Sequence, residues 1–254
     1  MISVRILLLS DIHANLEALE ACLAIAPAHD MVVNLGDIVG YGASPNEVLE
    51  KSRELGNIFV RGNHDKAATG QIELRDFNPV AGLAALWTRE HLKPANLEWL
   101  RGVPQGPVLI ADLPNVQLVH GSPVDEDEYV VTLEDAVEPL MVASTPVTFF
   151  GHTHLQGLFF SNGSSPDFFR PPYKTIGRTE TIDFRLRSNT RYMVNPGSVG
   201  QPRDGDWRAA FAVFDSEQQM VTFCRTPYGL KSAQDRILAA NLPQRLATRL
   251  AAGR

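Results

Sequence analysis

Cysteine is scarce in this sequence, and long apolar runs are absent. The two cysteines, Cys22 and Cys224, cannot supply a disulfide framework or a zinc site built on cysteine thiolates. A membrane-spanning helix needs about 18 consecutive apolar residues. The apolar opening segment MISVRILLLS is shorter than that, and it lacks the small-residue cleavage site of a signal peptide. We therefore expect a cytoplasmic protein without a membrane partner.

Positive charge is also in short supply, because 23 Lys and Arg residues stand against 29 Asp and Glu residues and the net charge is −6. Polyphosphate backbones attract basic surfaces, so this balance argues against general nucleic-acid binding. It does not exclude a small anionic substrate, because a bound metal ion can reverse the local sign of the charge. Internal repeats and linkers are absent as well, which predicts a single domain over residues 1–254.

The hydrophobic pattern alternates between strand-like and helix-like segments. Strand-like VRILLL precedes helix-like NLEALEACLAIA, and strand-like DMVVNLG precedes SPNEVLEKSREL, in which Pro45 begins a helix. Further strand-like runs follow in the second half of the chain. This order predicts a layered α/β or α/β/β/α domain. Three segments add to it: a helical insertion over 66–106, a basic β-rich insertion over 155–193 and a helical tail over 230–254.

Five of the short apolar runs are followed immediately by side chains that can bind a metal. They are Asp11 and His13; Asp37; Asn63, His64 and Asp65; His120; and His152 and His154. Five of the seven histidines are among them. The carboxyl ends of strands in open α/β sheets converge on one crevice, so we expect these side chains to meet in space.

The types of these side chains indicate which metals they would hold. Mixed His, Asp and Asn ligands suit Mn, Fe, Zn or Ni better than Ca²⁺, which prefers oxygen alone. They are too many for one tetrahedral ion, but their number fits two divalent ions that share a bridging carboxylate. Two such ions would outweigh the charges of Asp11 and Asp37 and attract a phosphate ester.

Five stretches resemble, in order, the motifs of the calcineurin-like metallophosphoesterases: SDIHAN, GDIVGYG, RGNHD, VHGSP and GHTH. NPGSVGQPRDGD at 195–206 is similar to the small bacterial phosphodiesterase-type branch. The resemblance implies a four-layer α/β/β/α sandwich with His64 beside two metal ions, facing the leaving oxygen of the substrate. It implies one ion held by Asp11, His13, Asp37 and His154 and a second ion held by Asp37, Asn63, His120 and His152.

The sequence departs from the protein-phosphatase branch of that family after the Gly-Asp motif. That branch has an Asp that orients the histidine and an Arg that grips phosphate, and Gly40 and Tyr41 stand at these positions here. Their absence argues against a phosphoprotein phosphatase. Asp65 is then the candidate that would orient His64 through a hydrogen bond.

Basic residues outside the motifs are candidates for binding the anionic substrate. Segment 155–193 carries six basic and three acidic residues, and its TIDFRLR stretch places Arg185 and Arg187 on one face of a strand. These two arginines either help to attract the substrate or lie on an exposed hairpin. Arg203 is a further candidate for contact with a phosphate, and the DEDE run at 125–128 is expected to be a solvated loop.

The hypothesis that unites these features is a dinuclear metal-dependent phosphoesterase. It would hydrolyse a small phosphodiester or nucleotide-like ester through a metal-bridging hydroxide, and His64 would protonate the leaving oxygen. A dinucleoside polyphosphate hydrolase and a phosphomonoesterase are alternatives within the enzyme class. A protein-interaction scaffold on the same fold is an alternative outside it, because a fold alone does not decide function. The complete ligand set together with His64 favours the enzyme.

Overall fold

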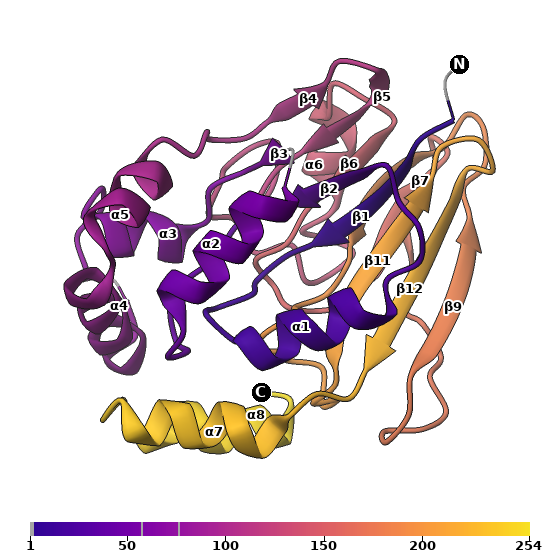
Figure 1. Ribbon diagram of the computed structural model, residues 1–254. Coiled ribbons are helices and arrows are strands. Elements are labelled where there is room, and N and C mark those ends of the chain that lie inside the picture. Colours follow the sequence, from indigo (N-terminus) through magenta and orange to yellow (C-terminus); the bar gives the residue numbers. More distant parts are fainter. Residues whose placement is uncertain (1–2, 57, 76) are drawn as a thin grey trace.

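Two six-stranded sheets form the centre of the structure, which is a computed structural model that describes residues 3–56, 58–75 and 77–254 (Figure 1). The first sheet has the strand order β3 (Ile58–Phe59), β2 (Met31–Asn34), β1 (Arg5–Leu9), β11 (Ala209–Asp215), β12 (Met220–Thr226) and β9 (Glu180–Arg185). The second has the order β4 (Val108–Ile110), β5 (Leu113–Leu118), β6 (Val147–Phe149), β10 (Arg191–Asn195), β7 (Gly157–Ser161) and β8 (Asp167–Phe169).

Strand β1 shows why the sheets pack on each other and on helices. Its residues are apolar without interruption from Ile6 onward, and alternate side chains point to opposite faces of the sheet. Ile6 and Leu8 belong to the apolar core shared with the second sheet, whereas Leu7 and Leu9 belong to the core that the helices cover. Burial on both faces explains the unbroken apolar run.

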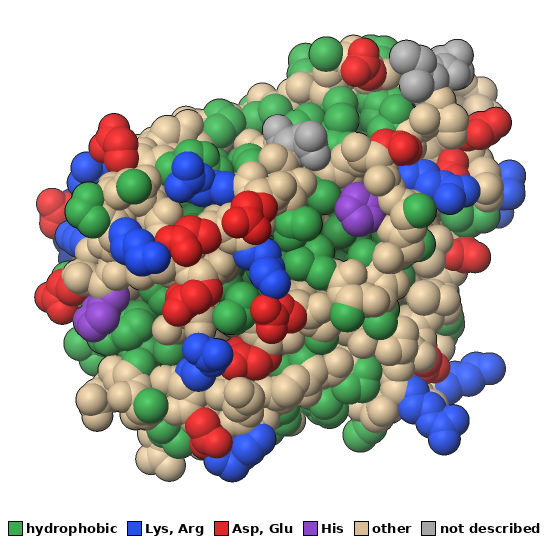
Figure 2. All heavy atoms as spheres, viewed as in Figure 1, with side chains coloured by type: hydrophobic (Ala, Val, Ile, Leu, Met, Phe, Trp, Pro, Cys, Tyr) green, Lys and Arg blue, Asp and Glu red, His purple; other side chains and the backbone are tan. Residues whose placement is uncertain are grey.

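Helices cover the outer faces of both sheets. The helices α1 (Leu16–Ile25), α2 (Pro45–Leu55), α7 (Leu230–Ala239) and α8 (Gln244–Ala252) contribute apolar side chains to the core outside the first sheet. The helix α6 (Val137–Val142) packs in a smaller core outside the second sheet. The four-layer α/β/β/α sandwich that the sequence predicts is therefore confirmed. On the helical face, acidic and basic side chains are interspersed (Figure 2), and pairs such as Lys51–Glu20, at 2.9 Å, link neighbouring helices.

Segment 66–106 contains the end of α3 (Asn63–Thr69) and the whole of α4 (Pro79–His91) and α5 (Pro94–Arg101). The side chain of Asn78 caps α4 by accepting a hydrogen bond from the backbone N–H of Val80 at 3.0 Å. Because α4 and α5 both contact α2, they extend the helical layer sideways. Nowhere in the described ranges does a helix reach the length and apolarity that crossing a membrane requires.

Residues 155–193 are built into the sandwich and do not stand apart from it. They form β7 and β8 and the start of β10 in the second sheet, and they form β9 at the edge of the first. The side chains of β9 alternate between half-buried and exposed, as expected for an edge strand with one face toward water. The tail over 230–254 is helical, as predicted, and α7 contacts both α1 and α8 below the first sheet (Figure 1).

Candidate metal centre

The loops after β1, β2, β5 and β6 bring their polar side chains to one buried place. Two groups of potential metal ligands lie there, and Asp37 belongs to both. All of these side chains are buried, and within each group the ligand atoms lie within 4.8 Å of one another. The first group consists of Asp11, His13, Asp37 and His154, and the second consists of Asp37, His120 and His152.

The distances between ligand atoms match the edges of a metal coordination shell. In the first group, Nε2 of His13 lies 3.1 Å from Nε2 of His154 and 3.6 Å from Oδ2 of Asp37. In the second group, Nε2 of His120 lies 3.5 Å from Oδ2 of Asp37 and 3.4 Å from Oδ1 of Asn63. With metal–ligand bonds of about 2.0–2.2 Å, neighbouring ligand atoms in a tetrahedral or octahedral shell are separated by roughly 3–3.5 Å.

Main-chain carbonyls fix which nitrogen of each imidazole carries its hydrogen. Each ring has one nitrogen bonded to a carbonyl oxygen: His13 to Val39 at 3.1 Å, His120 to Leu35 at 2.7 Å, His152 to Asp127 at 3.0 Å and His154 to Gln201 at 2.5 Å. A carbonyl only accepts, so in the neutral ring the other nitrogen holds a lone pair. These nitrogens face each other in pairs at 3.1 Å. Two lone pairs repel, whereas a cation between them attracts both, so this donor set fits metal ions.

Burial sets the protonation of these ligands. It lowers the pKa of His13 and His154 well below the ordinary value and that of His152 to about 3, so the three rings are neutral at pH 7. Burial also favours the neutral form of His120, but the Asp37 carboxylate beside this ring outweighs burial and raises the pKa of His120 to about 10. A bound cation would take the place of that proton.

The ligand loops have unusual backbone geometry. Non-glycine residues seldom adopt a positive φ, and such positions cluster at functional sites. Five ligands have a φ between 50° and 64° in the left-handed region, namely Asp11, His13, Asp37, His152 and His154. Main-chain hydrogen bonds between the loops hold this conformation, because Asp11 N–H donates to Gly36 at 3.0 Å and His13 N–H donates to Asp37 at 2.9 Å.

The sequence profile of the calcineurin-like phosphoesterase superfamily domain matches residues 4–219. The chain belongs to this superfamily. A metallophosphoesterase from Sphaerobacter thermophilus is 40% identical over 100% of both chains, and its crystal structure superposes with a TM-score of 0.84. A hypothetical protein from Pyrococcus horikoshii OT3 shares the fold, with 21% identity over 99% of both chains and a TM-score of 0.76. An uncharacterized protein of Methanocaldococcus jannaschii is 33% identical over 100% of both chains. Family and fold together support a phosphoester hydrolase.

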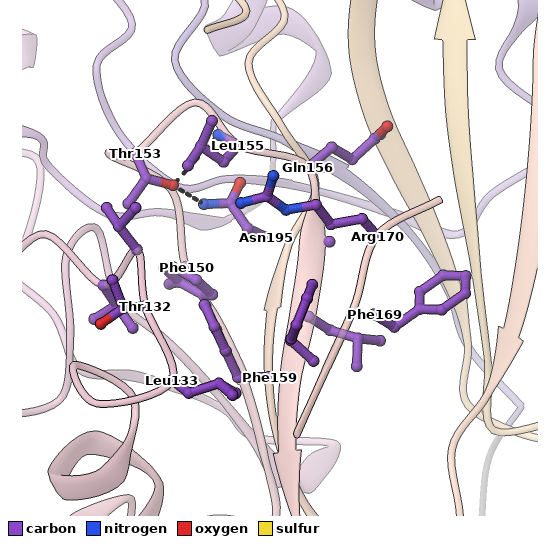
Figure 3. Close-up of a pocket in the computed structure, with 15 residues that line it drawn as sticks. Thr132, Leu133, Phe150, Thr153, Leu155, Gln156, Phe159, Phe169, Arg170 and Asn195 are labelled. Carbon is purple, nitrogen blue, oxygen red and sulfur yellow. Dashed lines mark hydrogen bonds between the residues drawn. The ribbon is translucent and has the colours of Figure 1, made fainter. Parts of the chain in front are cut away.

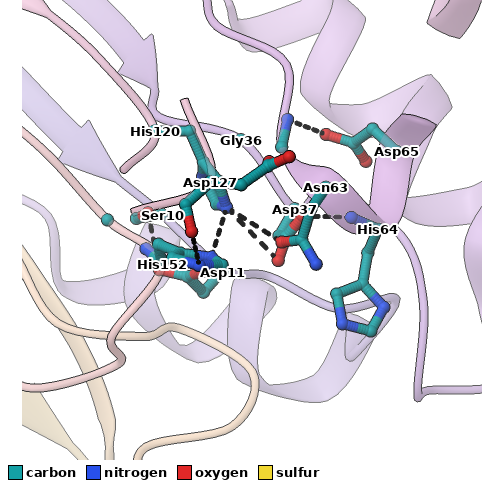
Figure 4. Close-up of polar contacts among 12 residues, drawn as sticks. Ser10, Asp11, Gly36, Asp37, Asn63, His64, Asp65, His120, Asp127 and His152 are labelled. Atoms are coloured by element: carbon teal, nitrogen blue, oxygen red, sulfur yellow. Dashed lines mark hydrogen bonds and ion pairs between the residues drawn. The ribbon is translucent and has the colours of Figure 1, made fainter. Parts of the chain in front are cut away.

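Asp65 does not bind the His64 ring, so the expected orienting bond is wrong. Its Oδ1 accepts hydrogen bonds from the backbone N–H groups of Ile38 and Val39 at 3.0 and 3.2 Å, and its Oδ2 accepts one from Gly62 at 3.0 Å. A carboxylate at the third position of a helix turns back toward the main chain at the helix start. Asp65 therefore ties the loop that carries Asp37 to the beginning of α3 (Figure 4).

His64 lies beside the ligands and reaches them through its main chain. Its backbone N–H donates to Oδ1 of Asp37 at 2.8 Å, and its ring extends away from that bond (Figure 4). The ring packs on Tyr41 and His13, with centroids 4.3 and 4.9 Å away. Within the described part of the chain, Nδ1 of His64 is buried and has no hydrogen-bond partner. Gly40 makes room for the ring, because a Cβ at that position would lie 2.6 Å from Nδ1.

Asn195 fixes the loop that carries His152 and His154. Its Nδ2 donates to the main-chain oxygen of Gly151 at 2.7 Å and to Oγ1 of Thr153 at 3.0 Å (Figure 3). Behind this loop lies a cavity of about 120 Å³ that is lined mainly by aromatic and aliphatic side chains. None of the metal ligands lines that cavity, so its role is separate from the metal centre.

Of the three candidate substrate-binding arginines, one lies at the metal centre and two lie away from it. The backbone N–H of Arg203 donates to the main-chain oxygen of His154 at 3.3 Å, so Arg203 lies at the centre. Arg185 and Arg187 lie elsewhere, on the exposed face of β9 and just beyond its end. The strand register puts Arg185 level with Arg5 at the start of β1, whereas Asp11 follows the end of β1 (Figure 1). Both side chains are exposed, as in the alternative of an exposed hairpin, although β9 is an edge strand paired with β12 in the first sheet.

The acidic run at 125–128 is a loop in which Asp125 and Asp127 are exposed, as expected, but the loop also packs against the site. Glu126 pairs with Arg61 and Lys66, both at 3.0 Å. Lys66 also pairs with Asp127 at 2.6 Å, and the main-chain oxygen of Asp127 accepts the hydrogen bond of His152. The sequence signal for this packing is a pair of basic residues, Arg61 at the start of the RGNHD motif and Lys66 directly after it.

Two tyrosines at the site carry no signal of their own in the sequence. The ring of Tyr129 lies 3.9 Å from the ring of His152, and Tyr41 packs on His64. Both tyrosines line a cavity of about 620 Å³ that opens beside His64 and Asn63. This cavity is the space in which a substrate can reach the metal ligands.

Proposed function

We propose that the protein is a dinuclear metal-dependent phosphoesterase that hydrolyses a small phosphate ester, either a phosphodiester or a nucleotide-like ester. The observation that supports it best is the set of four buried imidazoles that join Asp11 and Asp37 in two groups, with the ligand atoms of each group within 4.8 Å of one another. The first ligand group would hold one divalent ion, and the second group, completed by Asn63, would hold the other. Mn, Fe, Zn and Ni suit such mixed nitrogen and oxygen donors.

When bound, the ions supply positive charge to the phosphoryl oxygens and activate a water molecule. The chain's own residues position and protonate the substrate. As the bond from the water oxygen to phosphorus forms and the bond to the leaving oxygen breaks, His64 would give that oxygen a proton. Burial lowers the pKa of His64 to about 4. A phosphate anion beside the ring favours the imidazolium and raises that pKa in the substrate complex.

Metal analysis combined with an assay of two esters tests this proposal. The protein loaded with each metal in turn should hold two ions per chain and should hydrolyse p-nitrophenyl phosphate or bis(p-nitrophenyl) phosphate. His120→Ala should lose the second ion. His29→Ala is the matched control, because His29 lies between α1 and β2, at the amino end of the strand. A wild-type protein that binds no ions, or that hydrolyses neither ester with any metal, would overturn the proposal.

A further inference from the structure

Arginines from two distant parts of the chain gather around Tyr41. Arg203 lies in the loop before β11, and Arg249 lies on α8. Their Cζ atoms are 5.9 and 5.4 Å from the centroid of the Tyr41 ring, and Arg203 donates a hydrogen bond to the Tyr41 hydroxyl at 3.3 Å. Arg245 lies one turn before Arg249 on the same helix and lines the same cavity.

These three arginines have no acidic side chain as a partner within the described ranges. The acidic residues nearest to Arg203 in the sequence, Asp204 and Asp206, pair with Arg225 and Arg208 instead. Nε of Arg203 is buried and has no hydrogen-bond partner there. Burial and the charge of Arg203 both lower the pKa of Arg249. Guanidinium groups held together in this way repel each other, and a bound anion would remove that repulsion.

The cavity lined by these arginines has a volume of about 510 Å³ and adjoins the one beside His64. Four residues line both cavities, namely Tyr41, Asn78, Ala81 and Tyr129. A ligand at the metal centre that extends past Tyr41 would therefore enter the arginine-lined cavity. The start of α4 forms one wall and α8 forms the other, which suits a small molecule.

We propose that the arginine-lined cavity binds a second phosphoryl group of the substrate, so that the preferred substrates are small phosphate esters with two phosphoryl groups. This inference rests on the proposed phosphoesterase function. A guanidinium presents a planar fork of N–H donors that matches phosphate oxygens, which explains why arginine rather than lysine lines the cavity. The metal centre would hold the phosphoryl group that is cleaved, and Arg203, Arg245 and Arg249 would hold the other.

A binding measurement tests the cavity without catalysis. Metal-free wild-type protein should bind inorganic pyrophosphate in a calorimetric titration, and Arg245→Ser/Arg249→Ser should weaken that binding at least about tenfold, because charge-assisted hydrogen bonds are lost. Arg185→Ser/Arg187→Ser is the matched control, since it removes the same charge from exposed positions and should bind as the wild type does. Equal weakening in both double variants, or in neither, would overturn the proposal.

A kinetic measurement tests the substrate class. For metal-loaded wild type, kcat/KM should be higher for adenosine 3′,5′-bisphosphate than for adenosine 3′-monophosphate. Arg245→Ser/Arg249→Ser should lower the ratio of the two values at least about tenfold, whereas the control should keep it. The single variant Arg245→Ser, at an exposed position, should lower the ratio severalfold. It replaces the double variant in this test if the double variant does not fold. A ratio that is the same in wild type and variants would overturn the inference. A wild type that hydrolyses neither p-nitrophenyl phosphate nor bis(p-nitrophenyl) phosphate would refute the proposed function, and the pyrophosphate titration would still decide whether the cavity binds phosphate.

Discussion

Two clusters of polar side chains, each built around buried charged groups, are organised in opposite ways in this protein. One is the Arg208 cluster, which consists of Arg208, Arg225, Asp204, Asp206, Glu180 and Gln156. The other is the metal centre. Arg208 and Arg225 are 0% and 1% exposed, and Asp11 and Asp37 are also 0% and 1% exposed. Burial alone therefore does not distinguish a structural cluster from a functional one.

In the Arg208 cluster, donors meet acceptors. Arg208 pairs with Asp206 at 2.6 Å and with Glu180 at 3.0 Å, and Arg225 donates from Nε to Gln156 at 3.0 Å and pairs with Asp204. Glu180 also accepts hydrogen bonds from the backbone N–H groups of Lys174 and Thr175, and these bonds together lower its pKa to about 2. Each buried guanidinium has an acidic partner, so this cluster needs no ligand to balance its charge.

In the first ligand group of the metal centre, acceptors meet acceptors, because the lone pairs of His13 and His154 and the carboxylate of Asp11 point at one another. In the second group, the proton on His120 stands where a cation would bind. In the arginine-lined cavity, donors gather, and among the described residues their acceptors are not acidic side chains: Nε of Arg249 donates to the main-chain oxygen of Arg254 at 2.5 Å, and Arg203 donates to Oε1 of Gln201 at 3.2 Å. The sign of the mismatch indicates the missing partner: a cation for the metal centre and an anion for the cavity. A cluster in which every donor has an acceptor indicates a structural role, and a cluster with unpaired donors or acceptors indicates a binding site.

The largest effect is expected for Asp37→Asn, which removes the carboxylate shared by both ligand groups. A neutral amide neither bridges two cations nor balances their charge, so both ions should be lost and ester hydrolysis should fall to background. Elemental analysis and the nitrophenyl assay measure this. Asp183→Asn on the exposed face of β9 is the control and should keep both ions. Retention of two ions by Asp37→Asn would contradict the assignment of Asp37 as the bridge.

The next largest effect is expected for His64→Ala. If His64 is the general acid, its loss should cost roughly 10²–10⁴ in rate. The cost should be greatest for alkyl esters, because an alkoxide needs a proton and a nitrophenolate departs readily without one. Bound metal should stay near the wild-type content, since His64 is not in either ligand group. Rates on both ester types and metal content in one preparation decide the question. Equal losses on the two esters would exclude the general-acid role, and loss of metal would mean that His64 supports the ligands.

Arg225→Met tests the structural side of the comparison. Asp204 is exposed, so its lost charge partner costs little, but the substitution leaves Oε1 of Gln156 and the main-chain oxygen of Arg208 without the hydrogen bonds that Arg225 donates. The free energy of unfolding should fall by about 1–3 kcal/mol. The folded fraction should keep its metal content and its rate per ion. Denaturant unfolding followed by metal analysis provides both values, and Arg185→Met at an exposed site should leave stability unchanged within about 0.5 kcal/mol. Loss of metal from folded Arg225→Met would show that the two clusters are not independent.

The layered fold and the candidate ligands were predictable because their signals are local, whereas the division of the ligands into two groups came from the family resemblance. A short apolar run followed by Asp, His or Asn identifies a strand end, and the parallel strands carry these ends to one edge. The sequence left the role of Arg185 and Arg187 open for a physical reason, because strand alternation predicts the face of a side chain but not the end of the sheet at which it lies. That end depends on the antiparallel pairing of β9 with β12.

Contacts between distant segments left no local signal. Arg249 reaches Tyr41 only because α8 folds back against the first sheet and α7, and the basic residues of that tail resemble those of any solvated helix. Asp65 was assigned to the wrong partner for a similar reason. Its neighbour in the sequence is His64, but its carboxylate follows the geometry of a helix start and binds main-chain N–H groups of the Asp37 loop.

The smallest effect is expected for Gly40→Ala, which separates backbone strain from damage to the site. Gly40 and Gly163 have φ values of +90° and +97°, so alanine should destabilise each position by a similar amount, about 1–2 kcal/mol. Their surroundings differ. A Cβ at Gly40 would lie 2.6 Å from Nδ1 of His64, whereas a Cβ at Gly163 would meet nothing within 4 Å. Gly40→Ala should therefore displace the His64 ring and slow hydrolysis by up to about 10²-fold, less than the loss of the imidazole itself, while Gly163→Ala keeps the wild-type rate. Thermal unfolding and the ester assay on both variants measure the two effects separately. Equal activity in the two variants would show that the position of the His64 ring does not limit the reaction.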